Sequence, residues 1–468
     1  MNKTYFIKKI KFFFILIVFV TFAFTNIIYV FGNEKDVSNS KTLTVKESID
    51  IALSKSKGLL IAKSKIEEAY NGLGISKTNF LPKFSTAFNF VRLDEAPFFP
   101  TSSFARLGMG GGQLPPGDLP KKITIGDYNN YAAALSVNQP VFTGGKIINS
   151  HKIAQLNAIS SEANLQKTEN ELVYDVENTY WNVVMAQEFK KVAEEALKQV
   201  KSHMKDLENM YQVGMITENE LLRTKVQLSN AELTIIKANN GVKLTKIAFC
   251  NTVGLPLDSE IELIDKLELE QIPEIILKDA VVRAHLQRPE MKSMDANIEI
   301  AKKTVDVNKA GYLPNVYFLA DYGYRRPDRE YNKDFYGNWT VSLLFQFNIF
   351  DWGETSFKIS EAKNRLNQIE IAKSQIEDGI TLEVTQNYLK LLEAKEKVEM
   401  SPINVQQAEE NYRVTDEKFK EGMTTNTELL DANTLLTQAK TDYILALVEY
   451  KIALSGLKKS TGEFYEKK

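Results

Sequence analysis

A nine-residue segment occurs twice in this chain, at positions 214–222 and 422–430, and each copy has the features of a tight turn between two helices. Each begins with a glycine, which can adopt the positive φ that ends a helix. Three residues later comes a threonine with a glutamate three residues beyond it, the spacing of a capping box that starts a helix. The pairs are Thr217 with Glu220 and Thr425 with Glu428. The sequence therefore predicts two helical hairpins of one design.

The duplication extends far beyond these turns. Matching pairs at the same offset of 208 positions are Phe142 with Phe350 and Tyr180 with Tyr388. Nearer the start of each copy, the dipeptide Leu81-Pro82 matches Leu313-Pro314 at an offset of 232. The difference of 24 between the offsets predicts one insertion in the first copy, where a glycine run at 108–112 indicates a loop. We interpret residues 33–275 and 276–468 as two copies of one unit.

The first 32 residues have the pattern of an export signal. Four lysines lie within the first 11 residues, and an apolar run follows from Phe12 to Phe31. We expect residues 1–32 to be a signal peptide cleaved before Asn33, with an uncleaved anchor as the alternative. Beyond residue 32, no apolar run reaches the roughly 18–20 residues of a transmembrane helix. Any membrane crossing by the mature chain is therefore expected to be made by strands.

Composition argues against several functional classes. The formal net charge is −2, and removing the four N-terminal lysines makes it more negative, so nucleic acid is not an expected partner. The single cysteine, Cys250, excludes an intramolecular disulfide framework and a thiolate metal cluster. The histidines are His151, His203 and His285, and they lie far apart in the sequence. None of them has another histidine or a carboxylate at the spacing of a metal-ligand set. We expect no catalytic centre, no metal site and no cofactor.

Within each copy the apolar period changes from that of a helix to that of a strand. Helical patterns over about 44–80 and 277–312 both end at a Leu-Pro dipeptide. Alternating patterns then predict β-hairpins over 83–139 and 315–348, with strands of about ten residues, long enough to cross a bilayer when tilted. Aromatic residues near the strand ends resemble interfacial girdles. A soluble antiparallel sheet with one buried face would show the same alternation.

The membrane interpretation has a consequence for assembly. Two hairpins cannot close a barrel, and open sheet edges are not tolerated in lipid. Several chains would therefore have to share one barrel. In such a barrel Phe345 is expected on the lipid-facing side and Gln346 on the side of the lumen.

Each second strand is followed by a long helical hairpin, predicted at 144–252 and 352–460. A first helix of some 65–70 residues would be roughly 100 Å long. Pro402 is expected to kink or break the corresponding helix in the second copy. The returning helices carry an apolar stripe typical of coiled-coil packing, which includes Leu221, Leu233, Ile236, Leu429 and Leu436.

The junctions between strand and helix carry a family resemblance. Residues 139–146 read Gln-Pro-Val-Phe-Thr-Gly-Gly-Lys, and residues 347–354 are a partial echo. The junction residues of the first copy are Pro140, Phe142, Gly144 and Gly145. With the two Gly-Met turns, and with Tyr180 and Tyr388, this duplicated order resembles the TolC-like outer membrane efflux proteins (outer membrane factors) over residues 44 to about 462.

The resemblance implies an α+β membrane protein of the cell outer membrane that extends into the periplasm. It implies a homotrimer in which each chain gives four strands to a shared 12-stranded β-barrel, continuous with a long α-helical coiled-coil tunnel. It also implies a passive exit duct of a tripartite efflux or type I secretion system. Its partners would be outer membrane lipid, a periplasmic adaptor (membrane fusion) protein and an inner-membrane transporter. The alternative is an exported coiled-coil scaffold or adhesin whose strands form a soluble sheet.

The resemblance also places acidic residues at the tunnel entrance. Glu428 and Asp431 are three positions apart, so they lie on one helix face, and Glu220 has the corresponding place in the first copy. Three chains would gather six carboxylates from Glu428 and Asp431, a constriction that favours cations. Arg223 corresponds to Asp431 and would neutralise part of this charge. Ordinary solvent-facing charges are the alternative.

The turns match the segments at which family members meet the adaptor. The residues concerned are Val213, Gly214, Met215, Gly422 and Met423. Glycine allows close approach of a partner's backbone, and methionine offers an adaptable apolar contact, although helix termination alone would also explain the glycines. Where family members use an arginine and a tyrosine to hold the entrance shut, this chain has Thr424 and Phe419. The sequence therefore defines neither how closure is held nor the substrate.

Overall fold

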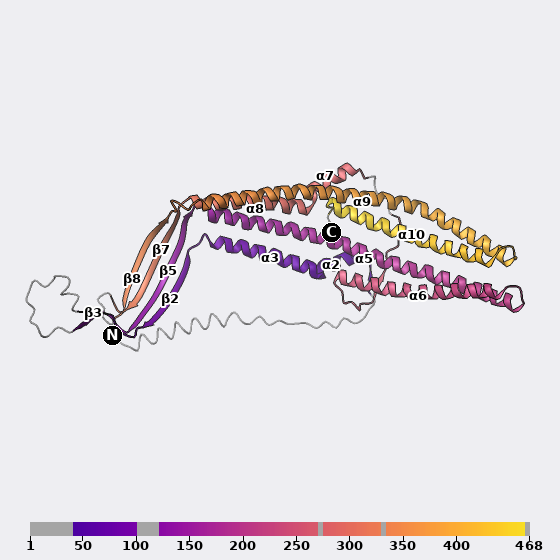
Figure 1. Ribbon diagram of the computed structural model, residues 1–468, viewed down its shortest axis with the longest axis horizontal. Coiled ribbons are helices and arrows are strands. Elements are labelled where there is room, and N and C mark those ends of the chain that lie inside the picture. The colour runs from indigo at the N-terminus through magenta and orange to yellow at the C-terminus, as the bar shows by residue number, and fades with distance from the viewer. Residues whose placement is uncertain (1–40, 101–120, 270–274, 329–333, 464–468) are drawn as a thin grey trace, which may run out of the picture. The chain divides into compact units, whose positions relative to one another are not determined.

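The two halves of the chain fold into the same succession of elements in the computed structural model, which describes residues 41–100, 121–269, 275–328 and 334–463 (Figure 1). The first half contains α2 (Val45–Lys55), α3 (Lys57–Thr78), β2 (Lys83–Arg92), β5 (Asn129–Thr143), α5 (Lys146–Gln212) and α6 (Glu218–Val253). The second contains α7 (Leu277–Gln287), α8 (Pro289–Lys309), β7 (Asn315–Arg326), β8 (Tyr336–Gln346), α9 (Glu354–Lys420) and α10 (Asn426–Thr461). The predicted signal peptide and the glycine run 108–112 lie outside the described residues.

Three shorter pieces accompany this duplicated pattern. A 3₁₀ turn, Ala310–Tyr312, follows α8. The strands β1 (Lys41–Leu43) and β6 (Ile261–Leu263) form one small sheet, and β3 (Phe98–Pro100) pairs with β4 (Lys122–Thr124) in another. These short strands were not predicted, because three residues are too few to show an alternating pattern.

The four long strands form one antiparallel sheet in the order β2-β5-β7-β8 (Figure 1). In the first hairpin Lys83 lies opposite Asn138, and in the second Asn315 lies opposite Gln346. These two pairs differ by the offsets 232 and 208 of the sequence repeat, so both hairpins have the same register. The predicted insertion therefore lies between Arg92 and Asn129, in the connection between the two strands of the first hairpin.

The register assigns the side chains of the sheet to two faces, because directly opposed residues share a face. Phe345 lies opposite Val316 and Gln346 lies opposite Asn315, so Phe345 and Gln346 are on opposite faces. The face of Phe345 carries large apolar side chains that are exposed in the single chain, with Phe88 73 % and Phe345 66 % exposed. The other face is mainly polar, as the alternating pattern predicts.

The short helices differ from the prediction in both copies. The expected single helices over 44–80 and 277–312 are each divided, at Ser56 and at Arg288, where ψ is 125° and 132°. In the second copy the sequence contains a feature that favours this division. Pro289, at the start of α8, disfavours helical geometry in the preceding residue. The reason for the division is tertiary, because the end of a long return helix packs against each break.

Two glycines make this packing possible. Gly254 ends α6 and Gly462 ends α10, both in the left-handed conformation. A Cβ on Gly254 would lie 2.8 Å from the carbonyl oxygen of Lys55, and one on Gly462 would lie 3.1 Å from the backbone nitrogen of Arg288. The repeat offsets relate these two contacts, so the same joint occurs in each copy.

Of the kink or break predicted at Pro402, the break is wrong, because α9 runs continuously from Glu354 to Lys420. Proline removes one backbone donor, but packing holds the helix on either side of it. Val398, one turn earlier, is buried in the same cluster as Leu447 of α10, while Pro402 itself is exposed. As a result α9 has 67 residues, the same number as α5, which corresponds to about 100 Å.

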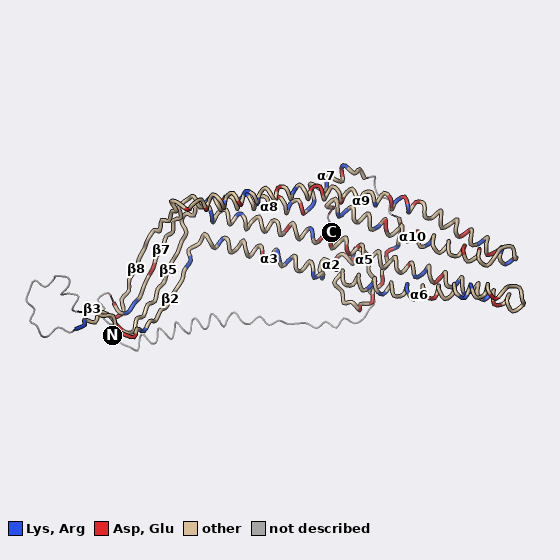
Figure 2. Tube along the Cα trace, viewed as in Figure 1, with Lys and Arg blue, Asp and Glu red and all other residues tan. Residues whose placement is uncertain are grey.

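Buried residues form three clusters along the helices. One surrounds Tyr180 in the first copy, a second surrounds Tyr450 in the second copy, and a third lies near the two turns around Leu207 and Leu429. Lysine, arginine and acidic residues are interspersed along the long helices (Figure 2). In the predicted apolar stripe of α6, Leu233 and Ile236 are exposed rather than packed within the chain.

No helix in the described part of the chain combines the length and apolar character needed to cross a bilayer.

We expect Gly254→Ala to lower thermal stability more than Gly214→Ala. Both glycines have positive φ, so alanine costs about 1–2 kcal/mol of backbone strain at either position. At Gly254 the added Cβ also meets backbone atoms of Lys55 that cannot rotate away, whereas nothing lies within 4 Å at Gly214. Thermal unfolding of the purified variants, followed by circular dichroism, measures the difference. Equal losses would contradict the tight joint at Gly254.

Candidate functional site at the helical hairpin turns

The two turns have the same backbone geometry. Gly214 has φ 77° and Gly422 has φ 72°. The N–H of Met215 donates to the carbonyl of Met210, and the N–H of Met423 donates to that of Lys418, each at 2.8 Å. Each glycine N–H also donates to a carbonyl three residues earlier, so both turns are Schellman motifs.

The turns present apolar side chains to solvent. Met215 and Met423 are each 72 % exposed, and Val213 is similarly exposed. Space around both glycines is open, since a Cβ there would meet no atom within 4 Å. Helix termination explains the positive φ of the glycines but not the exposed methionine beside each of them. The predicted contact residues therefore form two accessible apolar tips.

The predicted entrance acids take part in the helix caps. In the first turn a carboxylate oxygen of Glu220 accepts from the N–H of Thr217 at 3.2 Å, while the threonine hydroxyl accepts from the N–H of Glu220 at 3.4 Å. Thr425 and Glu428 form the equivalent capping box with both distances at 3.3 Å. These are the capping boxes that the sequence predicts.

The second turn has further contacts. The hydroxyl of Thr424 donates to the carboxylate of Glu428, which gives this departure from the family pattern a local role. Asp431, one turn along α10, is exposed beside the buried residues Leu430 and Ala432. Glu428 and Asp431 thus lie on the exposed side of α10, as their spacing predicts. Arg223 donates to the hydroxyl of Thr427, which places its charge between the two hairpins.

A buried polar network, which sequence reasoning missed, connects the two hairpins at this end. Nε2 of His203 in α5 lies 2.7 Å from Oδ1 of Asn426, and a donor on Nε2 fits this acceptor. The amide of Asn426 donates to the hydroxyl of Thr224 at 3.1 Å and to the carbonyl of Glu220 at 3.2 Å. Asn426 is the first residue of α10, and the corresponding residue of the first copy, Glu218, is exposed. The difference between Asn426 and Glu218 at equivalent positions was the feature of the sequence that could have indicated this network.

Phe419 packs against the same buried network. Its ring meets that of His203 edge to face, with centroids 5.0 Å apart, and it is buried with Leu207 and Leu429. The place at which family members carry a tyrosine is therefore a packed apolar contact in this chain. The turns are held together here by Phe419 packing and by the Asn426 network rather than by Thr424.

The junction residues lie at the other end of the long helices. β5 extends through Pro140 to Thr143, beyond the predicted end at residue 139, with an irregularity between Pro140 and Phe142 where it pairs with β7. Gly144 and Gly145 then have φ of 60° and 84°, and α5 begins. The structure does not bring these residues near the turns, because α5 separates them.

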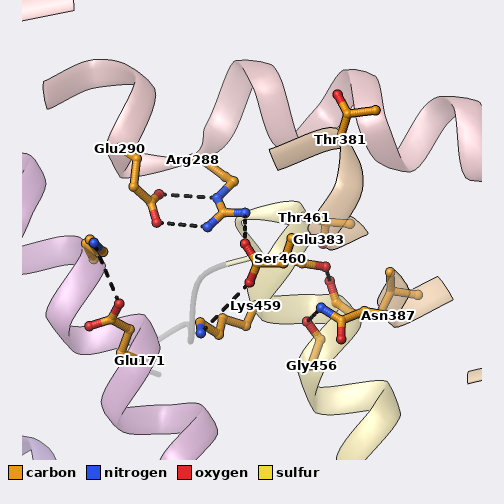
Figure 3. Close-up of polar contacts among 12 residues, drawn as sticks. Glu171, Arg288, Glu290, Thr381, Glu383, Asn387, Gly456, Lys459, Ser460 and Thr461 are labelled. Atoms are coloured by element: carbon orange, nitrogen blue, oxygen red, sulfur yellow. Dashed lines mark hydrogen bonds and ion pairs between the residues drawn. The ribbon is translucent and has the colours of Figure 1, made fainter. Parts of the chain in front are cut away.

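A cluster of charges around a buried guanidinium, that of Arg288, lies at the break between α7 and α8 (Figure 3). Its guanidinium donates to both carboxylate oxygens of Glu290, at 2.9 and 3.2 Å, and to Glu383 of α9 at 2.6 Å. Burial raises the pKa of Glu290, but the hydrogen bonds and charge of Arg288 lower it more, so the net pKa is below the ordinary value. The stabilisation is therefore present at neutral pH and is lost as pH falls through that lowered pKa. The cluster joins α8 to α9 and is structural.

Within the ranges that the structure describes, no group of three or more histidine, cysteine or acidic side chains is arranged to hold a metal ion.

The fold is a duplicated unit of two strands and a long helical hairpin. Solved outer membrane channels have the same fold. The Campylobacter jejuni CmeC outer membrane channel matches with a TM-score of 0.76 at 18 % identity, covering 89 % of this chain and 85 % of that one. The family model described as outer membrane efflux protein matches residues 48–254 and 280–463, one segment in each copy. The chain belongs to this family.

Relatives in this family agree with that assignment. The alkaline protease secretion protein AprF of Pseudomonas aeruginosa is 22 % identical over 343 residues, which is 72 % of this chain and 70 % of the relative. The probable efflux pump outer membrane protein TtgC of Pseudomonas putida is 22 % identical over 354 residues, 73 % of this chain and 70 % of the relative. The protein is located in the outer membrane and is an exit duct for efflux or secretion. An exported scaffold or adhesin is not favoured.

We expect Asn426→Ala to loosen the second turn. The substitution leaves the buried Nε2 of His203 and the hydroxyl of Thr224 without their shared partner, at a cost of about 1–3 kcal/mol. Hydrogen exchange of amides on both sides of Gly422 should accelerate, and the midpoint of thermal unfolding should fall.

Glu218→Ala is the matched control, because Glu218 is the corresponding first helical residue and is exposed. It should change exchange near Gly214 much less. If the two variants behave alike, the Asn426 network does not hold the hairpins together.

Proposed function

We propose that three copies of this chain assemble into one duct, each giving β2, β5, β7 and β8 to a shared barrel of twelve strands. One observation carries the proposal: the sheet has two outer edges, on β2 and β8, that pair with no other strand among the described residues. Four strands are too few to close a barrel, and unpaired edges are not tolerated in hydrocarbon. The number three comes from the family resemblance.

The exposed apolar face of the sheet supports a position within lipid. Its exposed members include Phe84, Phe88, Trp339, Leu343 and Phe345. A soluble sheet of this kind would cover such a face, because a large contiguous apolar patch on a monomer is unfavourable in water. The opposite face, with Ser85, Asn89, Asp321 and Gln346, suits a water-filled lumen.

The helices α6 and α9 also carry apolar side chains that no other described part of the chain covers. On α6 the exposed apolar residues include Leu222, Val226, Leu233, Ile236 and Leu244, and on α9 they include Leu382, Leu389, Met400 and Ile403. The seven-residue steps from Val226 to Leu233 and from Leu382 to Leu389 are those of a coiled-coil seam. A neighbouring copy that brings α6 against α9 would bury both seams and complete the wall of the tunnel.

At the turns, the apolar tips support contact with a periplasmic adaptor that links the duct to an inner-membrane transporter. Val213, Met215 and Met423 are exposed beside the open backbone of Gly214 and Gly422. Methionine adapts its shape to a partner, and glycine permits close approach. The relatives named for protease secretion and for efflux differ in what passes through them, so selectivity in this proposal lies with the transporter.

The entrance acids would give the narrow end of the duct a negative potential. Glu428 and Asp431 of three copies would contribute six carboxylates, and Glu220 three more beside them. A low-dielectric neck focuses such a field and raises the local concentration of cations. Arg223, which contacts Thr427, reduces this potential without cancelling it.

A positive charge should distinguish the two faces of the sheet. We expect Phe345→Arg to impair assembly, since an arginine on the lipid-facing surface costs up to about 2–4 kcal/mol at mid-depth and less toward the strand ends, where Phe345 lies. Gln346→Arg, on the adjacent strand position but the opposite face, should be tolerated. The fraction of heat-modifiable oligomer on electrophoresis measures the effect, and the reverse order would exchange the two faces.

Multivalent cations should block current through the reconstituted protein. We expect the double variant Glu428→Gln, Asp431→Asn to lose most of this block, because it removes six of the proposed carboxylates. Glutamine can still form the capping box, so the turn is preserved. Single-channel recording with and without a trivalent cation provides the measurement.

The double variant Glu370→Gln, Asp378→Asn is the control, because it removes the same charges from exposed positions of α9 far along the chain from the turn. It should be blocked like the original protein. Equal block in all three proteins would assign Glu428 and Asp431 to ordinary solvated helix positions.

A further inference from the structure

A hollow of about 580 Å³ lies at the end of the four-stranded sheet where the strands connect to the long helices. Its walls come from β2, β5 and β7, from the segment between β8 and α9, from the first turns of α5 and α9 and from the end of α8. These elements meet at the junction between sheet and helices in Figure 1. We call this feature the junction hollow. Its volume is that of a site for a small organic solute.

The sheet contributes its polar face to the junction hollow. Lys83 and Asn138, which are directly opposed in the first hairpin, both line it. Asn315 also lines it and lies opposite Gln346, on the face that does not carry Phe345. In the proposed duct this face surrounds the lumen, so the hollow lies beside the path of the solute. Its place in the path rests on the proposed function, whereas the hollow itself is built by one chain.

Two lysines bring positive charge into the junction hollow. Lys83 of β2 and Lys146 of α5 are exposed, and neither forms an ion pair or a side-chain hydrogen bond with another residue in the ranges that the structure describes. A third lysine of the hollow, Lys358 of α9, is paired with Glu354. The ammonium groups of Lys83 and Lys146 are therefore the ones available to a ligand.

The acidic groups of the junction hollow are engaged at the start of α9. Besides Glu354, the hollow contains Asp351, whose carboxylate accepts from the N–H of Gly353 at 3.0 Å and from that of Thr355 at 2.9 Å. The partial positive charge of a helix N-terminus offsets a carboxylate placed there. Gly145 caps α5 without a side chain, so the N-terminus of α5 adds to the positive potential of the lysines.

Side-chain amides supply neutral donors beside these charges. Among the described residues, the amides of Asn138 and Asn315 have no hydrogen-bond partner, although both line the junction hollow. An amide nitrogen can donate two hydrogen bonds, and a lysine ammonium can donate three. Ammonium and amide donors converging on one cavity, with its carboxylates already engaged, suit a ligand that is rich in acceptors and negatively charged.

We propose that the junction hollow binds an oxyanion, namely the carboxylate or phosphate group of a solute that passes through the duct. Lys83 and Lys146 provide the opposite charge, and Asn138 and Asn315 donate to the oxygens of the anion. The site holds the solute weakly, since a site within a conducting path must also release what it binds.

The positive region is limited to the base of the sheet. Asp321 is on the same face of β7 as Tyr317, which lines the hollow, but it lies four residues further along, or about 13 Å away. The entrance acids are further still, beyond the 67 residues of α5 and α9. Charges separated by more than about 10 Å are largely screened at 0.1 M salt. The duct therefore has two separate zones, of which the entrance favours cations and the junction hollow favours anions.

Isothermal titration calorimetry with inorganic pyrophosphate tests this site. We expect the full-length protein in detergent, at about 50 mM salt to limit screening, to bind one pyrophosphate per chain. The double variant Lys83→Gln, Lys146→Gln should bind it at least about tenfold more weakly. Citrate in a parallel titration identifies the preferred group: tighter citrate binding would assign carboxylates, and tighter pyrophosphate binding would assign phosphates.

Two further variants separate the hollow from a general attraction to lysines. Lys77→Gln with Lys152→Gln removes two exposed lysines from α3 and α5 near the same junction that do not line the hollow, so binding should be unchanged. Asn315→Asp keeps every lysine but adds a carboxylate inside the hollow, so it should weaken binding as the first double variant does. Equal loss in the Lys77 and Lys152 control, or full binding by Asn315→Asp, would overturn the site.

The oligomeric state of the same samples separates this inference from the proposed assembly. Because one chain builds the hollow, specific binding by a folded monomer would support the site and contradict the trimer. A trimer that binds no pyrophosphate would contradict the site alone.

Single-channel recording tests the position of the site in the path. Pyrophosphate should reduce the current of the original protein and of the Lys77 and Lys152 control, and it should have much less effect on the Lys83 and Lys146 variant. Equal currents in all three proteins would show that the hollow does not lie in the path.

Discussion

The backbone edges of β2 and β8 impose the constraint on which the molecule depends. The apolar face that includes Phe88 and Phe345 favours hydrocarbon, but the N–H and C=O groups of an unpaired edge are costly there. Both requirements are met when another strand pairs with each edge. In the proposed assembly a further copy of the chain supplies that strand, so membrane insertion and assembly would depend on the same hydrogen bonds.

The equal lengths of the helices place the functional groups at the far end. Each outgoing helix, α5 and α9, has 67 residues, and each return helix, α6 and α10, has 36. Both turns are therefore the same number of residues from the start of their outgoing helices, although α9 contains a proline. This equality lets side chains of the two hairpins meet, as Asn426 does with the carbonyl of Glu220.

The places where the two copies differ are the places with specialised contacts. Asn426 replaces an exposed glutamate and becomes the centre of a buried network at the turns. Arg288 stands where the first copy has Ser56 and binds two glutamates. Trp352 stands where the first copy has Gly144. In the proposed assembly a duplicated chain would have two environments for equivalent positions, one facing its own other half and one facing a neighbour.

The duplication could be predicted by comparing the two halves of the sequence, and the strand alternation, the two turns and their capping boxes could be predicted because each depends on residues within a few positions. Partners far away in the chain decided the rest. The helix division at Arg288 and the continuity of α9 through Pro402 follow from packing against other helices. The contact of His203 with Asn426 joins residues 223 positions apart. Local patterns contain no record of such partners, so the sequence determined the elements and the tertiary structure decided which side chains meet.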